Sequence, residues 1–253
     1  MFSSILSRAR RSVRAATVAG GLGLLIVSVI IPLSGFAAAP SNLCAANDYK
    51  CVIHYGDLAI GVRQAALATL NAHVTTQFKA GRITSSDNAT LTGDIATNES
   101  GLSALKVKLD ADTDATTARA DFRTIYTKFR IFIVVLPRDY HELWLDMIIH
   151  KDNQLQGNET LIQDAINGAP ASVQAQANQL FSDYKTQVTN SLAQTAAAQQ
   201  IIPQLTPSAF NSDPAAYKTT LTTYRTDIRT AAQDTKTAIS DLHQIVQLLK
   251  SAS

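Results

Sequence analysis

Apolar side chains recur at every third or fourth position from Val52 to the end of the chain, and no segment alternates for long between apolar and polar residues. A period near 3.6 residues places such positions on one face of an α-helix. The pattern predicts an all-α protein, an elongated antiparallel, coiled-coil-like bundle of about five or six long helices. Helices of about 30 residues would be roughly 45 Å long, so we expect a rod.

The last segment carries the clearest pattern, because its apolar positions keep a spacing of four and three residues over several heptads. Asp213 precedes it as a helix cap, and Pro214 suits the first turn, where a missing N–H costs nothing. One long terminal helix is therefore predicted. Its buried seam is expected to contain Tyr217, Leu221, Tyr224, Ile228, Ala231, Thr235, Ala238, Leu242, Ile245 and Leu249.

A second seam runs through residues 84–110, where Thr84 and Asp87 predict a capping box at the helix start. Asn98 falls among its apolar positions, where a polar residue either sets the register between helices or is solvated. Further seams are expected over residues 118–136 and 144–162, together with helices over residues 53–80 and 170–202. Within the third seam, residues 129–136 are apolar on every side, which predicts the central helix of a monomer.

The predicted breaks between helices are short and fall at Gly81 and at residues 110–114, 168–170 and 203–214. Pro137 stands alone inside a helical pattern, so it either kinks one long helix or separates two.

The start of the chain resembles an export signal in its layout. Four arginines, Arg8 to Arg14, precede an apolar stretch over residues 15–31, which Pro32 and several small residues follow. Residues 1–39 are predicted to be a signal peptide that is removed, with an uncleaved membrane anchor as the alternative. A cysteine-containing segment (40–52) and the helical bundle (53–253) would then lie outside the cytoplasm, secreted or at the cell surface.

The charge of the chain changes once this segment is set aside. The whole chain has 22 basic and 20 acidic residues, but the four arginines belong to the signal, so the remainder is slightly acidic. Its basic residues are scattered among acidic ones, which argues against nucleic-acid binding. Membrane contact is expected only through an uncleaved N-terminal segment.

Cys44 and Cys51 are the only cysteines, and both follow the predicted cleavage site. In an oxidising compartment such a pair is expected to form a disulfide. The alternative is a metal site, but His54 is the only further ligand nearby, which leaves a zinc set incomplete.

Several short sequences across residues 80–140 resemble a family of exported, all-helical hypothetical proteins of actinobacteria and candidate-phylum bacteria. The resemblance implies a bacterial, exported, helical protein; no activity is assigned to this family, so no functional residue is carried over. The matching residues are Ile83-Thr84, Gly101-Leu102 with Leu105, Asp110 to Thr113, Arg119, Asp121, Arg123, Ile125, Phe129 to Phe132, and Leu136-Pro137.

The nearest approach to a catalytic constellation is His141, Glu142, Asp146 and His150, which share one side of a predicted helix. Their spacing differs from the His-Glu-x-x-His zinc pattern, and no matching pair occurs on another helix. We therefore expect a solvated, salt-bridged helix face, with a metal-dependent enzyme as an unfavoured reading. No cofactor or metal is predicted.

Aromatic residues concentrate between residues 126 and 144, which indicates core packing or a patch for a partner or ligand. The patch would comprise Phe129, Phe132, Tyr140 and Trp144. The sequence as a whole favours a non-catalytic, exported structural or interaction protein with an unidentified protein or envelope partner, and self-association is possible in such a bundle. The alternative is a helical bundle that binds a small apolar ligand at these aromatics.

Overall fold

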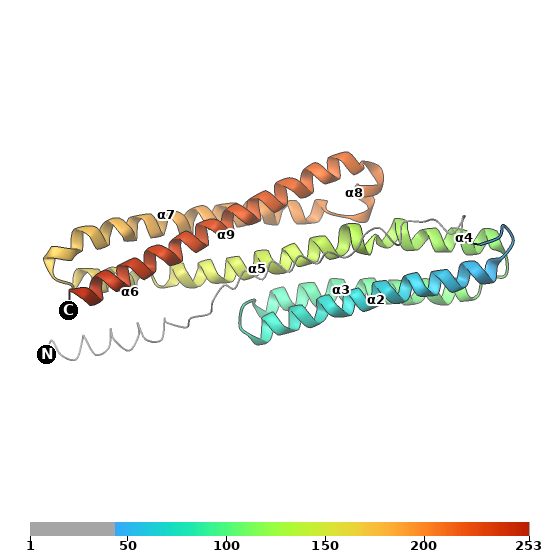
Figure 1. Cartoon of the computed structure of the whole chain (residues 1–253), viewed down its shortest axis with the longest axis horizontal. Helices are drawn as coiled ribbons and strands as arrows, with labels where there is room; N and C mark the ends of the chain where they lie inside the picture. Colours follow the sequence, from blue (N-terminus) through green and yellow to red (C-terminus); the bar gives the residue numbers. More distant parts are fainter. Residues whose placement is uncertain (1–43, 253) are drawn as a thin grey trace.

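The computed structural model describes residues 44–252, and these residues are almost entirely helical, as the sequence predicts. Two antiparallel helical hairpins lie along one central helical path (Figure 1). The first hairpin is α2 (Tyr49–Lys79) with α3 (Ser85–Asp110), and the second is α7 (Ala171–Ile201) with α9 (Pro214–Ser251). The central path comprises α4 (Ala115–Thr124), the π-helices η2 (Ile125–Phe129) and η3 (Ile131–Val135), α5 (Leu136–Gly157) and α6 (Glu159–Asn167).

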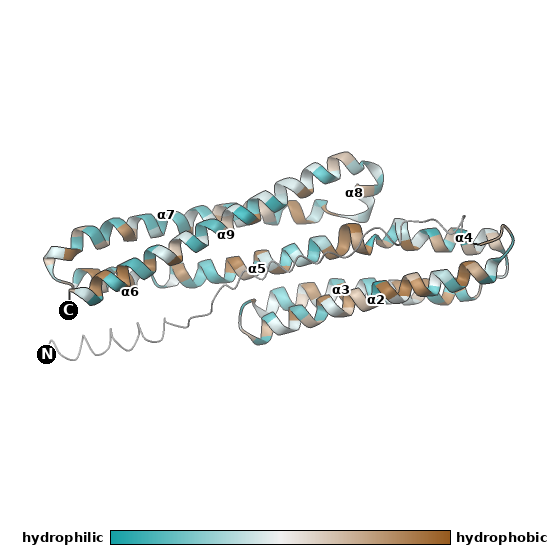
Figure 2. Cartoon of the chain, viewed as in Figure 1, coloured by the Kyte–Doolittle hydropathy of each residue, from teal (hydrophilic) through white to brown (hydrophobic). Residues whose placement is uncertain are grey.

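The two hairpins contact different parts of the central path, so the described molecule is long and narrow (Figure 1). The first hairpin packs against α4, the π-helices and the start of α5, around a buried apolar cluster that includes Leu67, Leu102 and Ile125. The second hairpin packs against α5 and α6 around two further clusters. Figure 2 shows that each long helix carries both apolar and polar residues.

The predicted helix ends coincide with real capping interactions. Thr84 and Asp87 form a reciprocal capping box, since each side chain accepts a hydrogen bond from the backbone N–H of the other. Asp213 accepts from the N–H groups of Ala215 and Ala216, at 3.0 Å each, with Pro214 in the first turn. These side chains satisfy N–H groups that a helix start leaves unpaired.

The seam predicted for α9 is buried from Tyr217 to Ala238 and again at Ile245, while Leu242 and Leu249 are half-buried. On α3 the apolar members of the seam are buried, but Asn98 is half-buried and donates to the Asp94 carbonyl of its own helix. Asn98 therefore makes no hydrogen bond that sets the register between helices.

The break in the central path lies at Arg130 and not at Pro137. Arg130 has the left-handed backbone conformation, with φ 44° and ψ 39°, and separates the two π-helices. Pro137 lies in the first turn of α5, where a backbone N–H has no partner to lose. The helical path is thus interrupted at a residue that is neither glycine nor proline.

A short segment covers this break from the other end of the chain. The 3₁₀-helix η4 (Ile202–Gln204) and α8 (Pro207–Ser212) occupy the connection that the prolines predict between α7 and α9. Helix α8 contacts both π-helices. Segment 129–136 is central, as expected: Phe129, Ile131, Val135 and Leu136 belong to the first cluster and Val134 to the second, although Ile133 is exposed.

Candidate functional site

Cys44 and Cys51 form a disulfide, as the sequence predicts. Cys44 is buried, and Asp48 caps the start of α2 by accepting from the Cys51 N–H at 2.9 Å. Arg119 on α4 donates to the carbonyls of Cys44 and Ala45, at 3.2 and 2.8 Å. The disulfide and Arg119 together fix the entry of the chain into α2. The predicted signal or anchor, residues 1–39, lies outside the described residues.

The four aromatics of the predicted patch do not gather around one space. Phe129 is buried in the first cluster, and Phe132 and Tyr140 are half-buried against it. Trp144 packs against the second cluster, beside the other hairpin. The core-packing interpretation accounts for these positions.

Phe132 has a neighbour that the sequence does not reveal, the buried guanidinium of Arg63 on α2. The guanidinium carbon lies 4.5 Å from the centre of the Tyr126 ring and 5.2 Å from that of Phe132. Arg63 also donates to the Ala59 carbonyl at 2.8 Å. Burial lowers the pKa of Arg63. The aromatic faces stabilise a charge that would otherwise be costly inside a helical hairpin.

The face of α5 that holds His141, Glu142, Asp146 and His150 is half-buried, which corrects the expectation of a solvated face. Arg138 does not pair with these residues. It binds Asp94 of α3 at 3.0 Å and its neighbour Asp139 at 2.7 Å, and Asp139 is fully buried. The enclosed position arises because α5 lies between both hairpins.

Enclosure raises the pKa values of three carboxyl groups on α5. Burial raises the pKa of Asp139 to about 6, although Arg138 acts against the rise. Burial and the charge of Asp139 raise the pKa of Glu142 to about 7, and burial with the charge of Asp87 raises that of Asp146 to about 8. Burial lowers the pKa of His141. The three carboxyl groups can therefore change protonation near neutral pH.

Two polar atoms beside this face have no hydrogen-bond partner within the described structure, Asp139 Oδ2 and the Tyr224 hydroxyl. Among residues 44–252, no group of three or more His, Cys, Asp or Glu side chains is arranged to hold a metal ion. The chemistry that the face supports is proton uptake and release.

A second buried carboxyl group, Asp152, lies where α5, α7 and α9 meet. Ser191 donates to one of its oxygens, and Thr235 donates to the other at 2.7 Å. The two hydroxyl oxygens are 3.0 Å apart, and each lies 3.0 Å from the Ala231 carbonyl oxygen. Burial raises the pKa of Asp152 to about 6, against these hydrogen bonds. The sequence placed Thr235 on a seam but gave no sign that Asp152 faces it.

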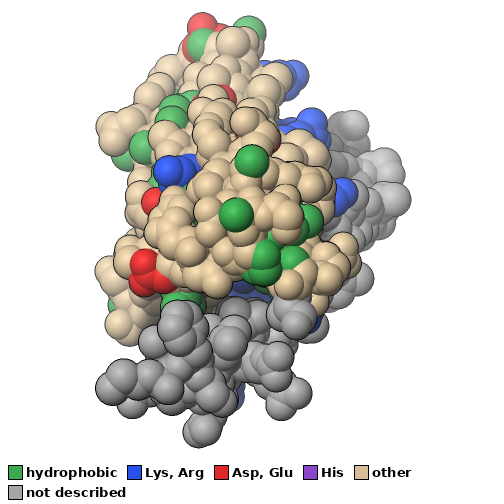
Figure 3. Space-filling view, turned by 90° about the vertical axis from the view of Figure 1, so that its left-hand side faces the viewer, with side chains coloured by type: hydrophobic (Ala, Val, Ile, Leu, Met, Phe, Trp, Pro, Cys, Tyr) green, Lys and Arg blue, Asp and Glu red, His purple; other side chains and the backbone are tan. Residues whose placement is uncertain are grey.

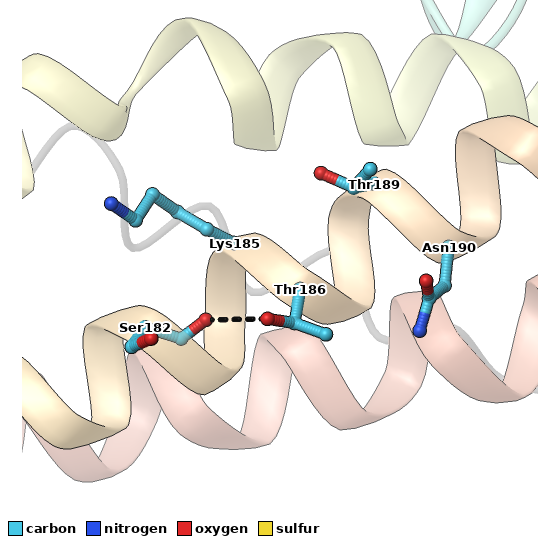
Figure 4. Close-up of a pocket in the computed structure, with 5 residues that line it drawn as sticks. All are labelled: Ser182, Lys185, Thr186, Thr189 and Asn190. Carbon is cyan, nitrogen blue, oxygen red and sulfur yellow. Dashed lines mark hydrogen bonds between the residues drawn. The ribbon is translucent and has the colours of Figure 1, made fainter.

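A shallow pocket of about 270 Å³ lies on the surface of α7. Its lining side chains come from one helix, namely Ser182, Lys185, Thr186, Thr189 and Asn190 (Figure 4). Thr186 donates to the carbonyl of Ser182 in its own helix, so this hydroxyl is already engaged. None of Phe129, Phe132 and Trp144 lines this pocket.

The surface feature that stands out is the solvent side of α2. A line of exposed residues follows it at alternating spacings of three and four; we call it the α2 outer face, and it consists of Tyr55, Leu58, Val62, Ala65, Thr69, Ala72 and Thr76. Leu58 is 51% exposed and Val62 39%. From Leu58 to Thr76, α2 contains one charged residue, Arg63, and that residue is buried. The apolar residues of this helix are visible in Figure 2.

The opposite side of α2 explains why sequence reasoning missed this surface. Val52, Ile60, Leu67 and Val74 already face the core of the hairpin. An apolar residue on α2 can thus belong to either side, and only the positions of α3 and α4 decide which side is covered. The heptad spacing of the outer face was the available signal.

The end of the molecule formed by α6 and the end of α9 provides a contrast. Figure 3 looks at that end, where backbone and uncharged polar side chains predominate, with several hydrophobic side chains and scattered charges of both signs among them. A uniform basic face of the kind that binds nucleic acid is not gathered there.

Comparison with known proteins assigns the chain to no family. The chain matches no protein-family model, no curated protein and no solved structure. Within residues 44–252, none of the helices combines the length and apolar character needed to cross a membrane.

Proposed function

We propose that the protein is exported and acts without catalysis, as a structural or interaction protein at the cell surface or in the surrounding medium. The α2 outer face is its contact surface. The observation that carries this proposal is a helix face of seven exposed residues that holds no charge, on a helix whose other side already fills a core.

An uncharged apolar face on the outside of a protein is costly to leave in water. Exposed apolar surface that is continuous, unlike scattered single residues, is characteristic of sites that bind another protein. Here Leu58 and Val62 are exposed on neighbouring turns of α2, and Tyr55 is 37% exposed one turn before Leu58. Contact with a partner removes this surface from water.

The disulfide supports the proposed compartment. Disulfides persist in oxidising environments outside the cytoplasm and are rare inside it. The two cysteines are seven positions apart, and Arg119 donates hydrogen bonds to the carbonyls of Cys44 and Ala45. The disulfide therefore reinforces the start of α2, the helix that bears the contact surface.

The buried chemical groups support a structural role. Asp152 is fully buried, and its oxygens accept from Ser191 and Thr235. Arg63 is 4% exposed between two aromatic rings. Groups held in this way join helices to one another.

The test uses the full chain, exported by its host and carrying an affinity tag at the C-terminus. Wild-type, Ala65→Glu and Ala96→Glu baits are incubated with the extracellular and envelope fractions of the host. Ala96 is an exposed alanine on α3 and provides the matched control. We expect the same proteins to be retained by wild type and Ala96→Glu and lost from Ala65→Glu.

Two results would contradict the proposal. One is that all three baits retain the same proteins, which would show that the α2 outer face is not the contact surface. The other is that the wild-type chain stays in the cytoplasm with both thiols reduced, which would show that it is not exported.

A further inference from the structure

We infer that the α2 outer face binds the same face of a second copy of this chain, with the two α2 helices antiparallel. This inference rests on the proposed function, because it uses the same surface, and it names the partner. It is carried by the order of large and small residues along the face, by the hydrogen bonds of its threonines and by the charges at its ends.

Large and small residues occupy opposite halves of the face. Tyr55, Leu58 and Val62 lie toward the N-terminus of α2, and the small Ala65 and Ala72 lie toward its C-terminus. Antiparallel pairing about Ala65 sets Leu58 of each copy against Ala72 of the other. Large residues then fill the space that small residues leave, which close helix packing requires.

Parallel pairing would give a different result with the same residues. Leu58 would meet Leu58 at one end, and Ala72 would meet Ala72 at the other. The helices would be held apart where the side chains are large and would leave voids where they are small. The size pattern therefore selects the antiparallel arrangement, which has the twofold symmetry of most homodimers.

The polar members of the face do not oppose burial. The Thr69 hydroxyl donates to the Ala65 carbonyl at 2.9 Å, and the Thr76 hydroxyl donates to the Ala72 carbonyl at 2.8 Å. Both hydroxyl protons keep these partners when a second helix covers them. Burial then leaves neither threonine donor unpaired, and an unpaired donor is the usual cost of enclosing a polar group.

The end of α2 is basic, whereas its start carries one acidic and one basic residue. Asp48 and Lys50 lie at the start of α2, whereas Lys79 and Arg82 lie at its end. Antiparallel pairing brings Asp48 of one copy toward Lys79 and Arg82 of the other. Parallel pairing would bring Lys79 against Lys79, which is unfavourable.

The extent of the face sets the strength of the association. From Tyr55 to Thr76 a helix extends over about 33 Å. Two such faces bury on the order of 1,000 Å² in total, near the lower limit for specific interfaces. The dimer should therefore be reversible and dissociate on dilution.

The decisive experiment is sedimentation equilibrium of the exported full chain over a range of concentrations. Wild type and Ala96→Glu should reach twice the monomer mass at high concentration. Ala65→Glu should stay monomeric, with a dissociation constant raised by about 100-fold, because the twofold axis places the two new carboxylates side by side. Circular dichroism melting should show that all three chains are equally folded.

A charge-pairing variant tests the geometry directly. Ala65→Lys alone should also be monomeric, whereas an equimolar mixture of Ala65→Glu and Ala65→Lys should recover the dimer mass. Such recovery requires residue 65 of one copy to lie beside residue 65 of the other. A mixture that stays monomeric although wild type dimerises would overturn the arrangement.

Other outcomes separate this inference from the proposed function. A wild-type chain that is monomeric at every concentration overturns self-association; if Ala65→Glu still loses a foreign partner, the contact surface stands. An Ala65→Glu chain that dimerises like wild type overturns the inferred surface. If, in addition, foreign partners are retained equally by all baits, both proposals are wrong.

Discussion

Arg130 donates from Nε to Oδ1 of Asn211 at 2.6 Å, and so connects the break in the central helical path to α8. Asn211 in turn donates to the Thr127 carbonyl at 2.7 Å, one turn before the break. The Arg130 guanidinium lies 4.6 Å from the centre of the Phe210 ring. Two residues of α8 thus hold both the side chain and the backbone at this position.

Two replacements of Arg130 should distinguish the effect of backbone strain on stability from the effect of its side-chain contacts. Arg130→Ala loses the hydrogen bond and the ring contact but keeps the left-handed backbone. Arg130→Gly loses the same contacts and relieves a backbone conformation that costs an L-residue about 1–2 kcal/mol. We expect Arg130→Gly to be more stable than Arg130→Ala by about 1 kcal/mol in urea unfolding. The reverse order would show that Arg130 is not strained.

Removal of Asp152 should weaken the junction of α5, α7 and α9. Asp152→Ala removes the carboxyl group that accepts from Ser191 and Thr235 and leaves both hydroxyls only the Ala231 carbonyl as an acceptor, which should cost about 1–3 kcal/mol. Asp183→Ala, an exposed change on α7, is the control. Thermal melting of both variants provides the measurement, and equal melting temperatures would disprove a structural role for Asp152.

Stability should fall as the pH rises from about 4 to 8. A carboxyl group with a raised pKa in the folded chain stabilises below its unfolded pKa of 3.8 and loses that contribution as the pH passes its folded value, about 6 for Asp139 and Asp152 and about 8 for Asp146. Glu142, with a pKa of about 7, has the same sign. His141 has a lowered pKa and acts in the opposite direction.

The free energy of unfolding should be lower at pH 8 than at pH 5 by on the order of 2 kcal/mol, after allowance for the partial exposure of Glu142 and Asp146. Urea unfolding at both pH values measures it. In a Glu142→Gln, Asp146→Asn double variant the dependence should become shallower. A wild type that is more stable at pH 8 than at pH 5 would contradict the expectation.

Loss of the disulfide should have a moderate effect. The Cys44→Ser, Cys51→Ser chain no longer closes a loop of about eight residues, which should lower stability by about 2 kcal/mol. Mass measurement of the wild-type chain before and after thiol alkylation should show both cysteines protected. Two alkylated thiols in exported protein would disprove the disulfide.

Replacement by alanine at three positions of the central segment should lower stability by different amounts. Phe129 is 7% exposed, so Phe129→Ala should cost about 3–5 kcal/mol. Phe132→Ala should cost less, about 1–3 kcal/mol, because Phe132 is half-buried. Ile133 is 42% exposed, and Ile133→Ala should change stability by less than about 1 kcal/mol. Chemical unfolding of the three variants tests this order.

Much of the fold could be predicted because its signals are local. The capping box of Thr84 and Asp87, the cap at Asp213 and the heptad seam of α9 depend on residues within a few turns of one another. The disulfide follows from two cysteines that lie close together in the sequence, after a segment that resembles an export signal. Each of these features acts over a short stretch of chain.

The features that could not be predicted depend on residues far apart in the sequence. Arg130 adopts a conformation that glycine would favour, and Asn211, which stabilises it, lies 81 positions away. Asp152 meets Ser191 and Thr235 across 39 and 83 positions. The α2 outer face is defined by what α3 and α4 leave uncovered, and a single helix pattern contains no information on its neighbours.

The contacts of Phe210 and Asn211 with Arg130 also affect the order in which parts of the protein reach their final structure. A ribosome releases the chain from its N-terminus, so the first hairpin and the central path emerge before α8 has been made. Until Phe210 and Asn211 arrive, Arg130 has neither its ring contact nor its hydrogen-bond acceptor. The N-terminal half can therefore form its helices early, but the interruption of the central path at Arg130 gains its contacts to α8 only when most of the chain has been synthesised.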